Sequence, residues 1–155
     1  MSLAGIITAV AGLVTTGSGV VNVHNGVRWA DQESVFRTLL RDATNGRIHC
    51  WFVNRRGETE AVTGTNNLTI IEHSVRVEGF YAVDDPGSGT SMTSEVAFRS
   101  VHESVLLKLR TSWTLSGSAM NSKVRVAEEG HRVLRGVLCH YIEIEVLAQE
   151  RTSYV

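Results

Sequence analysis

Two stretches of alternating side chains constrain the fold of this chain more than any other feature. Between residues 71 and 83, every second position suits a core, and Ser74, Arg76 and Glu78 lie between those positions. The core set is Ile71, His73, Val75, Val77, Gly79, Tyr81 and Val83. In residues 138–146 the same alternation sets Leu138, His140, Ile142, Ile144 and Val146 against Cys139, Tyr141, Glu143 and Glu145. Because neighbouring side chains of a strand point to opposite faces, both stretches predict long strands of a sheet with one wet face.

Three segments show helical spacing. Apolar residues recur at helical intervals over residues 3–14 with no preceding lysine or arginine, which favours a docked helix over a secretion signal. This run is also too short to cross a bilayer. Asp31 can cap a second helix that ends at Leu40. The third and strongest pattern spans residues 93–112 and predicts a buried stripe of Val96, Val101, Val105, Leu106 and Leu109.

The remaining patterns predict strands and turns. A short strand is expected at residues 20–24, and "RIHCWFVN" begins a second strand whose continuation "RRGETE" leads into a polar hairpin. A last hairpin is expected to turn around "EEG", residues 128–130. The chain therefore predicts one domain over residues 1–155 of the α+β class, a single-domain sandwich in which helices pack on one face of a mostly antiparallel β-sheet.

Composition excludes several classes of partner. The 155 residues carry 15 lysines and arginines against 16 acids, so a formal net charge of −1 gives no general attraction to nucleic acid or to an anionic membrane. The pair Arg55–Arg56 has Glu58 and Glu60 beside it, which indicates a solvated hairpin and not a sequence-specific nucleic-acid surface.

The loop in "GFYAVDDPGSGTS", residues 79–91, is the strongest candidate for chemistry. It has glycines and hydroxyls but no lysine, so it does not match a phosphate-binding loop. Asp84 and Asp85 could ligate a divalent cation, although two adjacent acids supply too few oxygens on their own. Asp, Pro-Gly, Ser and Thr also start turns and cap helices, and the loop is expected to be a joint between two elements.

The two cysteines each lie beside a histidine. Because His49 and Cys50 are expected on one strand and Cys139 and His140 on another, each pair can offer at most one ligand to a given zinc site. We expect both cysteines to be buried as small hydrophobic residues, and neither a metal nor another cofactor is predicted. No catalytic motif occurs in the sequence, and no enzymatic activity is expected.

The whole chain resembles the tail terminator (tail completion) proteins of long-tailed bacteriophages. The resemblance lies in the order and spacing of an N-terminal helix, "GVVNVHNGVRW", a short helix and "RIHCWFVNRRG", an aromatic and basic hairpin arm typical of such sequences. The strand "HSVRVEGFYAVDD" then leads through the loop into "SEVAFRSVHESVLLKL", and "RGVLCHYIEIEVLAQE" closes the pattern.

This resemblance implies a structural virion protein, assembled in the host cytoplasm, that performs no chemistry. Six copies would form a ring at the head-proximal end of the tail tube, stop tube polymerisation and provide the surface for head–tail joining. The implied partners are further copies of the chain, the tail tube protein, and a head–tail connector or neck protein, with DNA passing through the ring.

Projecting polar loops on a rigid sheet are where recognition usually occurs, so two segments are the expected protein interface. The expected interface residues are Arg55, Arg56 and Glu58 of the hairpin tip and Asp84, Asp85, Gly87 and Gly89 of the loop.

Three alternatives stay open from the sequence. The first is a related neck or head-completion protein. The second is a small metal- or ligand-binding enzyme domain that uses the loop at Asp84 and Asp85. The third is a monomeric accessory module of a larger assembly.

Overall fold

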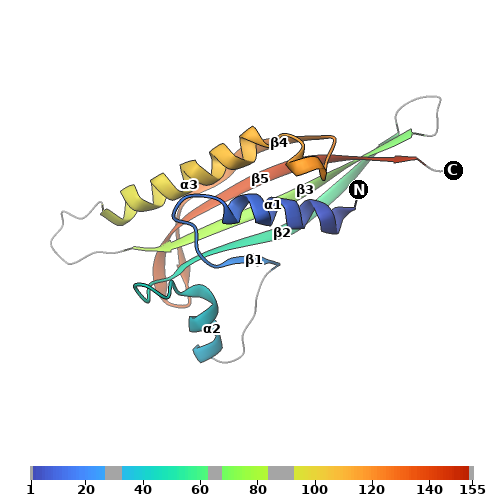
Figure 1. Cartoon of the computed structure of the whole chain (residues 1–155). Helices are drawn as coiled ribbons and strands as arrows, with labels where there is room; N and C mark the ends of the chain where they lie inside the picture. The colour runs from blue at the N-terminus through green and yellow to red at the C-terminus, as the bar shows by residue number, and fades with distance from the viewer. Residues whose placement is uncertain (1, 27–32, 63–67, 84–92, 154–155) are drawn as a thin grey trace.

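A five-stranded sheet organises the molecule, with strand order β1-β2-β3-β5-β4 (Figure 1). The structure is a computed structural model that describes residues 2–26, 33–62, 68–83 and 93–153. Its elements, in chain order, are α1 (Leu3–Thr15), β1 (Val23–Asn25), α2 (Glu33–Leu40), β2 (His49–Val62), β3 (Leu68–Ala82), α3 (Thr93–Thr111), the 3-10 turn η1 (Leu115–Gly117), β4 (Asn121–Leu134) and β5 (Val137–Ser153).

Only the short β1 runs parallel to its neighbour, and the other three pairings are antiparallel. The predicted α+β class and the mostly antiparallel sheet are therefore confirmed. The far ends of β2, β3 and β5 extend beyond the layer formed by α1 and α3 (Figure 1). The long hairpin of β2 and β3 is thus an arm that projects from the body of the molecule.

Helices α1 and α3 cover one face of the sheet and enclose the main core. The hydroxyl of Ser2 caps α1 by accepting a hydrogen bond from the backbone N–H of Gly5, and the predicted docked helix is confirmed. The core joins apolar residues of both helices to the inward side chains of β2, β3 and β5; its fully buried members include Ile6, Val10, Val14, Trp51, Val53, Val75, Val77, Val105, Leu109, Ile142, Ile144 and Val146. No helix in the described ranges combines the length and the apolar character needed to span a membrane.

The predicted stripe of α3 is correct except at its first position. Val101, Val105, Leu106 and Leu109 are buried, but Val96 is 61% exposed. Phe98 and His102 take its place in the core layer. The reason is geometric, because a residue five positions before Val101 lies on a different side of a helix with 3.6 residues per turn.

Trp51 and Gly79 are register partners on β2 and β3 and form a close contact in this core. A Cβ atom placed on Gly79 would lie 2.7 Å from the indole of Trp51, which is fully buried. The indole Nε1 of Trp51 donates to Nε2 of His49, 3.3 Å away. The glycine therefore leaves the space that the indole fills.

The opposite face of the sheet is not uniformly wet, which corrects the prediction. Cys50, Phe52, Phe80, Cys139 and Tyr141 form a second buried cluster there, together with Leu40, Ile48 and Ala82. Leu40 belongs to α2, so this short helix packs against the face that α1 and α3 leave open. Both cysteines are buried and unpaired, as expected.

The last hairpin turns later than predicted. Strand β4 continues through "EEG", and the turn lies at Arg135 and Gly136, whose φ angles are 52° and 80°. Two consecutive positive φ angles are typical of the tight two-residue turn that suits the twist of a hairpin. Gly130 has no positive φ angle and stays within the strand.

Candidate interaction surface

The expected interface residues fall into two groups. Asp84, Asp85, Gly87 and Gly89 lie outside the described residues. Arg55, Arg56 and Glu58 lie on β2, several residues before its end at Val62, and not at a hairpin tip as predicted. Strand β2 extends beyond the predicted segment "RIHCWFVN", because the polar residues 54–60 continue the pairing with β3.

A β-bulge at Arg56 separates the roles of these charges. The register of β2 against β3 shifts between Arg55 and Gly57. Arg55 forms an ion pair with Glu58 on the exposed strand surface. The guanidinium of Arg56 instead lies 2.9 Å from Oε1 of Glu143 on β5, so Arg56 is bound within the sheet, whereas the ion pair of Arg55 and Glu58 lies at the strand surface.

Arg56 belongs to a network of charges across the middle of the second face, which we call the charged ladder. Its acids Glu78, Glu143 and Glu145 lie on β3 and β5. Its cations Arg56, Arg76, Arg125 and Arg132 come from β2, β3 and β4. Glu143 and Glu145 are each only 6% exposed, although both side chains end in a carboxyl group.

Glu145 is the best satisfied acid of the charged ladder. Ser74 donates to its Oε1 at 2.9 Å, and Arg125 from β4 forms an ion pair with it. Burial alone would raise the pKa of Glu145, but these hydrogen bonds and the charges of Arg125 and Arg56 outweigh burial and hold the pKa below its ordinary value. The carboxylate therefore stays ionised in the folded protein at neutral pH.

Tyr141 joins the charged ladder to the apolar cluster at the α2 end. Its hydroxyl lies 3.0 Å from a carboxylate oxygen of Glu78 and 3.0 Å from one of Glu143, so its single proton is shared between these two acceptors. The guanidinium of Arg132 lies 3.8 Å from the ring centroid. Burial, followed by the charges and hydrogen bonds of Glu78 and Glu143, raises the pKa of this phenol. Glu78, Glu143 and Glu145 thus each have a partner within the sheet, and removal of one partner would leave a largely buried carboxylate unpaired.

Both edges of the sheet have strand backbone that pairs on one side only within the described chain. Strand β4 pairs with β5 and has no second neighbour there. At the other edge, β1 pairs with Trp51, Phe52 and Val53 alone, so β2 from Asn54 onward has β3 as its only partner. An unpaired strand edge presents a row of N–H and C=O groups to another chain.

Two large apolar side chains are exposed near the end of α3. Leu107 is 62% exposed and Trp113 is 61% exposed. Exposed tryptophan is unusual on a free surface and common at the centres of protein interfaces. Each of these side chains is thus a candidate contact that the sequence did not indicate.

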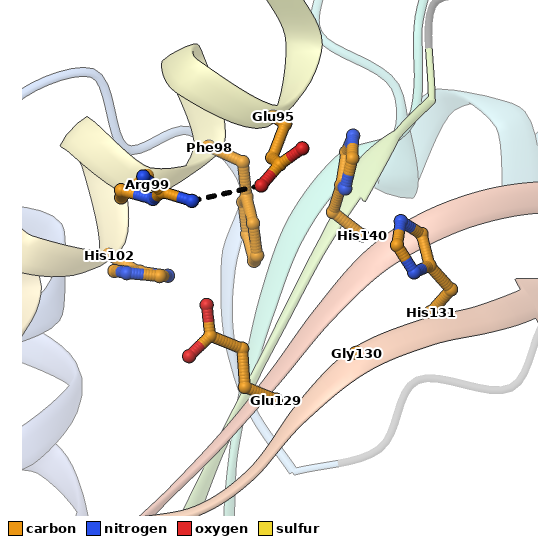
Figure 2. A pocket seen from close by; sticks show the side chains of 8 residues that line it. All are labelled: Glu95, Phe98, Arg99, His102, Glu129, Gly130, His131 and His140. Atoms are coloured by element: carbon orange, nitrogen blue, oxygen red, sulfur yellow. Dashed lines mark hydrogen bonds and ion pairs between the residues drawn. The ribbon is translucent and has the colours of Figure 1, made fainter. Parts of the chain in front are cut away.

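A cleft between α3 and the β4–β5 hairpin gathers three histidines (Figure 2). It has a volume of about 280 Å³ and is lined by Glu95, Phe98, Arg99, His102, Glu129, Gly130, His131 and His140. Nε2 of His140 lies 3.0 Å from the hydroxyl of Ser94, and the rings of His131 and His140 are 4.8 Å apart. Burial lowers the pKa of both His102 and His140, so both imidazoles are neutral at pH 7.

Metal chemistry has no support in the described ranges. No group of three or more histidine, cysteine, aspartate or glutamate side chains there is arranged to hold a metal ion. Burial raises the pKa of Cys139 to about 11, so its thiol stays protonated and is a poor ligand or nucleophile.

Comparison with known proteins assigns no family to the chain. No family model matches the chain, and no curated protein matches it significantly.

Proposed function

We propose that this chain is a tail terminator of a long-tailed bacteriophage. Six copies would form a ring on the head-proximal end of the tail tube, stop its polymerisation and present the joining surface to a connector or neck protein. The sequence resemblance motivates the proposal, and the open edges of the sheet support it.

The two open edges carry the argument for a ring. They lie on opposite sides of one sheet and differ in sequence, so β4 of one copy can pair with the far half of β2 of another only in a head-to-tail contact. A head-to-tail contact repeats around a closed ring when its rotation closes. In such a ring each open edge is covered by a neighbour, which removes the exposed backbone groups.

A tube terminator must also present two different surfaces. A tube that grows by stacking equal rings offers the same end surface after every step, so growth stops only when a ring matches that surface on one side and lacks it on the other. The apolar side chains of Leu107 and Trp113, exposed near the end of α3, differ in chemistry from the polar residues 54–60 along the β2 edge of the projecting arm, so the chain presents two different kinds of surface.

The mass of the protein in solution tests the ring. Light scattering is measured on the protein alone and after addition of purified tube protein, and six copies of the 17.0 kDa chain have a mass of about 102 kDa. We expect the ring in at least the second condition. A protein that stays monomeric in both conditions would contradict the proposal.

A pair of matched variants tests the contact that builds the ring. Val126 lies on the β4 edge and is 38% exposed, so Val126→Lys should block edge pairing and abolish the ring. Val96→Lys, on the outer side of α3, is the control and should leave the ring intact.

Removal of the protein from an infected cell should give overlong tails or tails that fail to join filled heads. Tails of normal length that are joined to heads would show that the protein has another function.

A further inference from the structure

The cleft between α3 and the β4–β5 hairpin has an uneven distribution of charge. Within it, Arg99 and Glu95 neutralise each other through a hydrogen-bonded ion pair of 2.9 Å. Glu129 reaches toward the same space from β4 and makes no hydrogen bond or ion pair with any residue of the described ranges (Figure 2). With His102 and His140 neutral, the acidic and basic side chains of the lining leave one uncompensated negative charge.

His102 is the second unusual group of the cleft. The residue is only 6% exposed, and its Nδ1 atom is buried without a hydrogen-bond partner. A buried polar atom without a partner destabilises the folded state, so such atoms are rare in folded proteins. His102 faces Glu129 across the cleft, with Arg99 and Glu103 of its own helix nearby.

We propose that this cleft binds a guanidinium or primary ammonium group, held by the carboxylate of Glu129 and by the neutral imidazole of His102. Glu129 supplies the charge, and Nε2 of His102 accepts a hydrogen bond from the cation, because Nδ1 is buried. Phe98, at the base of the cleft, gives an apolar surface for the methylene stem that carries such a group.

Other ligand classes fit less well. An anion would meet Glu129 without a free cation to pair with, because Arg99 is already bound to Glu95. A cleft of about 280 Å³ is at the lower limit for a drug-sized ligand and suits a single side chain or a small amine. The cation can therefore be a free small molecule or the arginine or lysine side chain of another protein.

Protonation should compete with the cation. Burial, which outweighs the attraction of Glu129 and Glu103 and acts together with the repulsion of Arg99, lowers the pKa of His102. Burial and the adjacent His131 lower the pKa of His140, against the opposite influence of Glu95. As the pH falls and these imidazoles become charged, the cleft loses its net negative charge and the affinity for a cation should decrease.

Nuclear magnetic resonance of the histidine side chains tests the site on the purified protein of 155 residues. The probes are methylguanidinium and n-butylammonium for a free small molecule, and a capped Gly-Arg-Gly peptide for a protein side chain, with butyramide as the uncharged control. We expect shifts of the His102 and His140 ring signals with at least one cationic probe and none with butyramide. Binding of the peptide alone would assign the site to a protein partner, and binding of the small cations as well would assign it to the group itself. No shift with any cation at tens of millimolar, or equal shifts with butyramide, would overturn the proposal.

Two matched variants locate the charge. Glu129→Gln should weaken binding of the cation about tenfold, the usual effect of losing one charge-assisted hydrogen bond. Glu128→Gln removes the same charge from the next residue, whose carboxylate pairs with Arg132, and should leave the affinity unchanged. Equal affinity for wild type and Glu129→Gln would also overturn the proposal, whatever the protein does in ring assembly.

Discussion

The contact between Trp51 and Gly79 makes a quantitative prediction about stability. In the variant Gly79→Ala, the new Cβ would lie 2.7, 2.8 and 3.0 Å from three atoms of the indole ring. The indole cannot move aside easily, because it is fully buried beneath Phe98 and donates to His49. Overpacking of a well-packed core costs about 1–3 kcal/mol, and the lower entropy of the unfolded alanine chain offsets about 0.5 kcal/mol of this. We therefore expect the free energy of unfolding to fall by about 2 kcal/mol.

Urea denaturation followed by circular dichroism measures this change. In thermal denaturation, the same loss of about 2 kcal/mol should lower the melting temperature by about 4–8 °C for a chain of this size. Gly130→Ala is the matched control, since Gly130 also lies within a strand and no atom lies within 4 Å of its added Cβ. This control should be neutral or slightly stabilising.

A double-mutant cycle separates the steric contact from other effects of the substitution. Trp51→Phe creates space at the position where the alanine methyl would collide. The destabilisation of Gly79→Ala should therefore be smaller by about 1 kcal/mol when Trp51→Phe is already present. If Gly79→Ala is as stable as Gly130→Ala, or if the two substitutions at the contact are additive, the indole does not occupy the space above Gly79.

Two further predictions concern charge. Burial lowers the pKa of His49 from 6.5 to about 4, against the attraction of Asp42, so the unfolded chain binds a proton in a pH range in which the folded protein does not. The free energy of unfolding should therefore fall as the pH drops from about 6.5 to about 4. His49→Gln keeps an acceptor for Trp51 and should reduce this pH dependence, measured as urea midpoints across the same range. Arg55→Glu should weaken docking to the tube protein without loss of stability, because the ion-pair partner of Arg55 in the described ranges is the exposed Glu58. Arg56→Glu should lower the free energy of unfolding by about 2 kcal/mol or more, because it places a negative charge beside the buried Glu143. Equal stability of these two variants would show that Arg56 does not support the charged ladder.

The sequence predicts the strands well because their alternation is long. Residues 71–83 and 138–146 fix two neighbouring strands, and helical spacing fixes α1 and most of α3. The burial of Glu143 and Glu145 could not be predicted in this way, since their partners come from three other strands. Only the register of the sheet brings Arg56, Arg76 and Arg125 to these acids, and charged residues taken one at a time indicate a wet face.

The three histidines of the cleft are another feature that depends on strand pairing and that the sequence did not predict. His102 follows Phe98 by four residues, so helical spacing could have placed it on the buried side of α3. His131 on β4 and His140 on β5 are register partners, because these two strands pair on either side of the turn at Arg135 and Gly136. The turn predicted from the sequence, around "EEG", would place Gly130 and its neighbours in a loop and would not bring these histidines together. The wrong position of this turn therefore prevents prediction of the cleft.

The position of β5 also bears on how a ribosome-bound chain could fold. This strand follows all the others in the sequence, yet it lies between β3 and β4 in the sheet. Strand β4 is therefore synthesised without a partner, and β3 keeps one long edge uncovered until the residues of β5 emerge. Such nascent edges readily pair with the wrong chain. Synthesis that pauses between Leu134 and Val137 should accordingly leave an aggregation-prone intermediate, and the last strand to emerge completes the middle of the sheet.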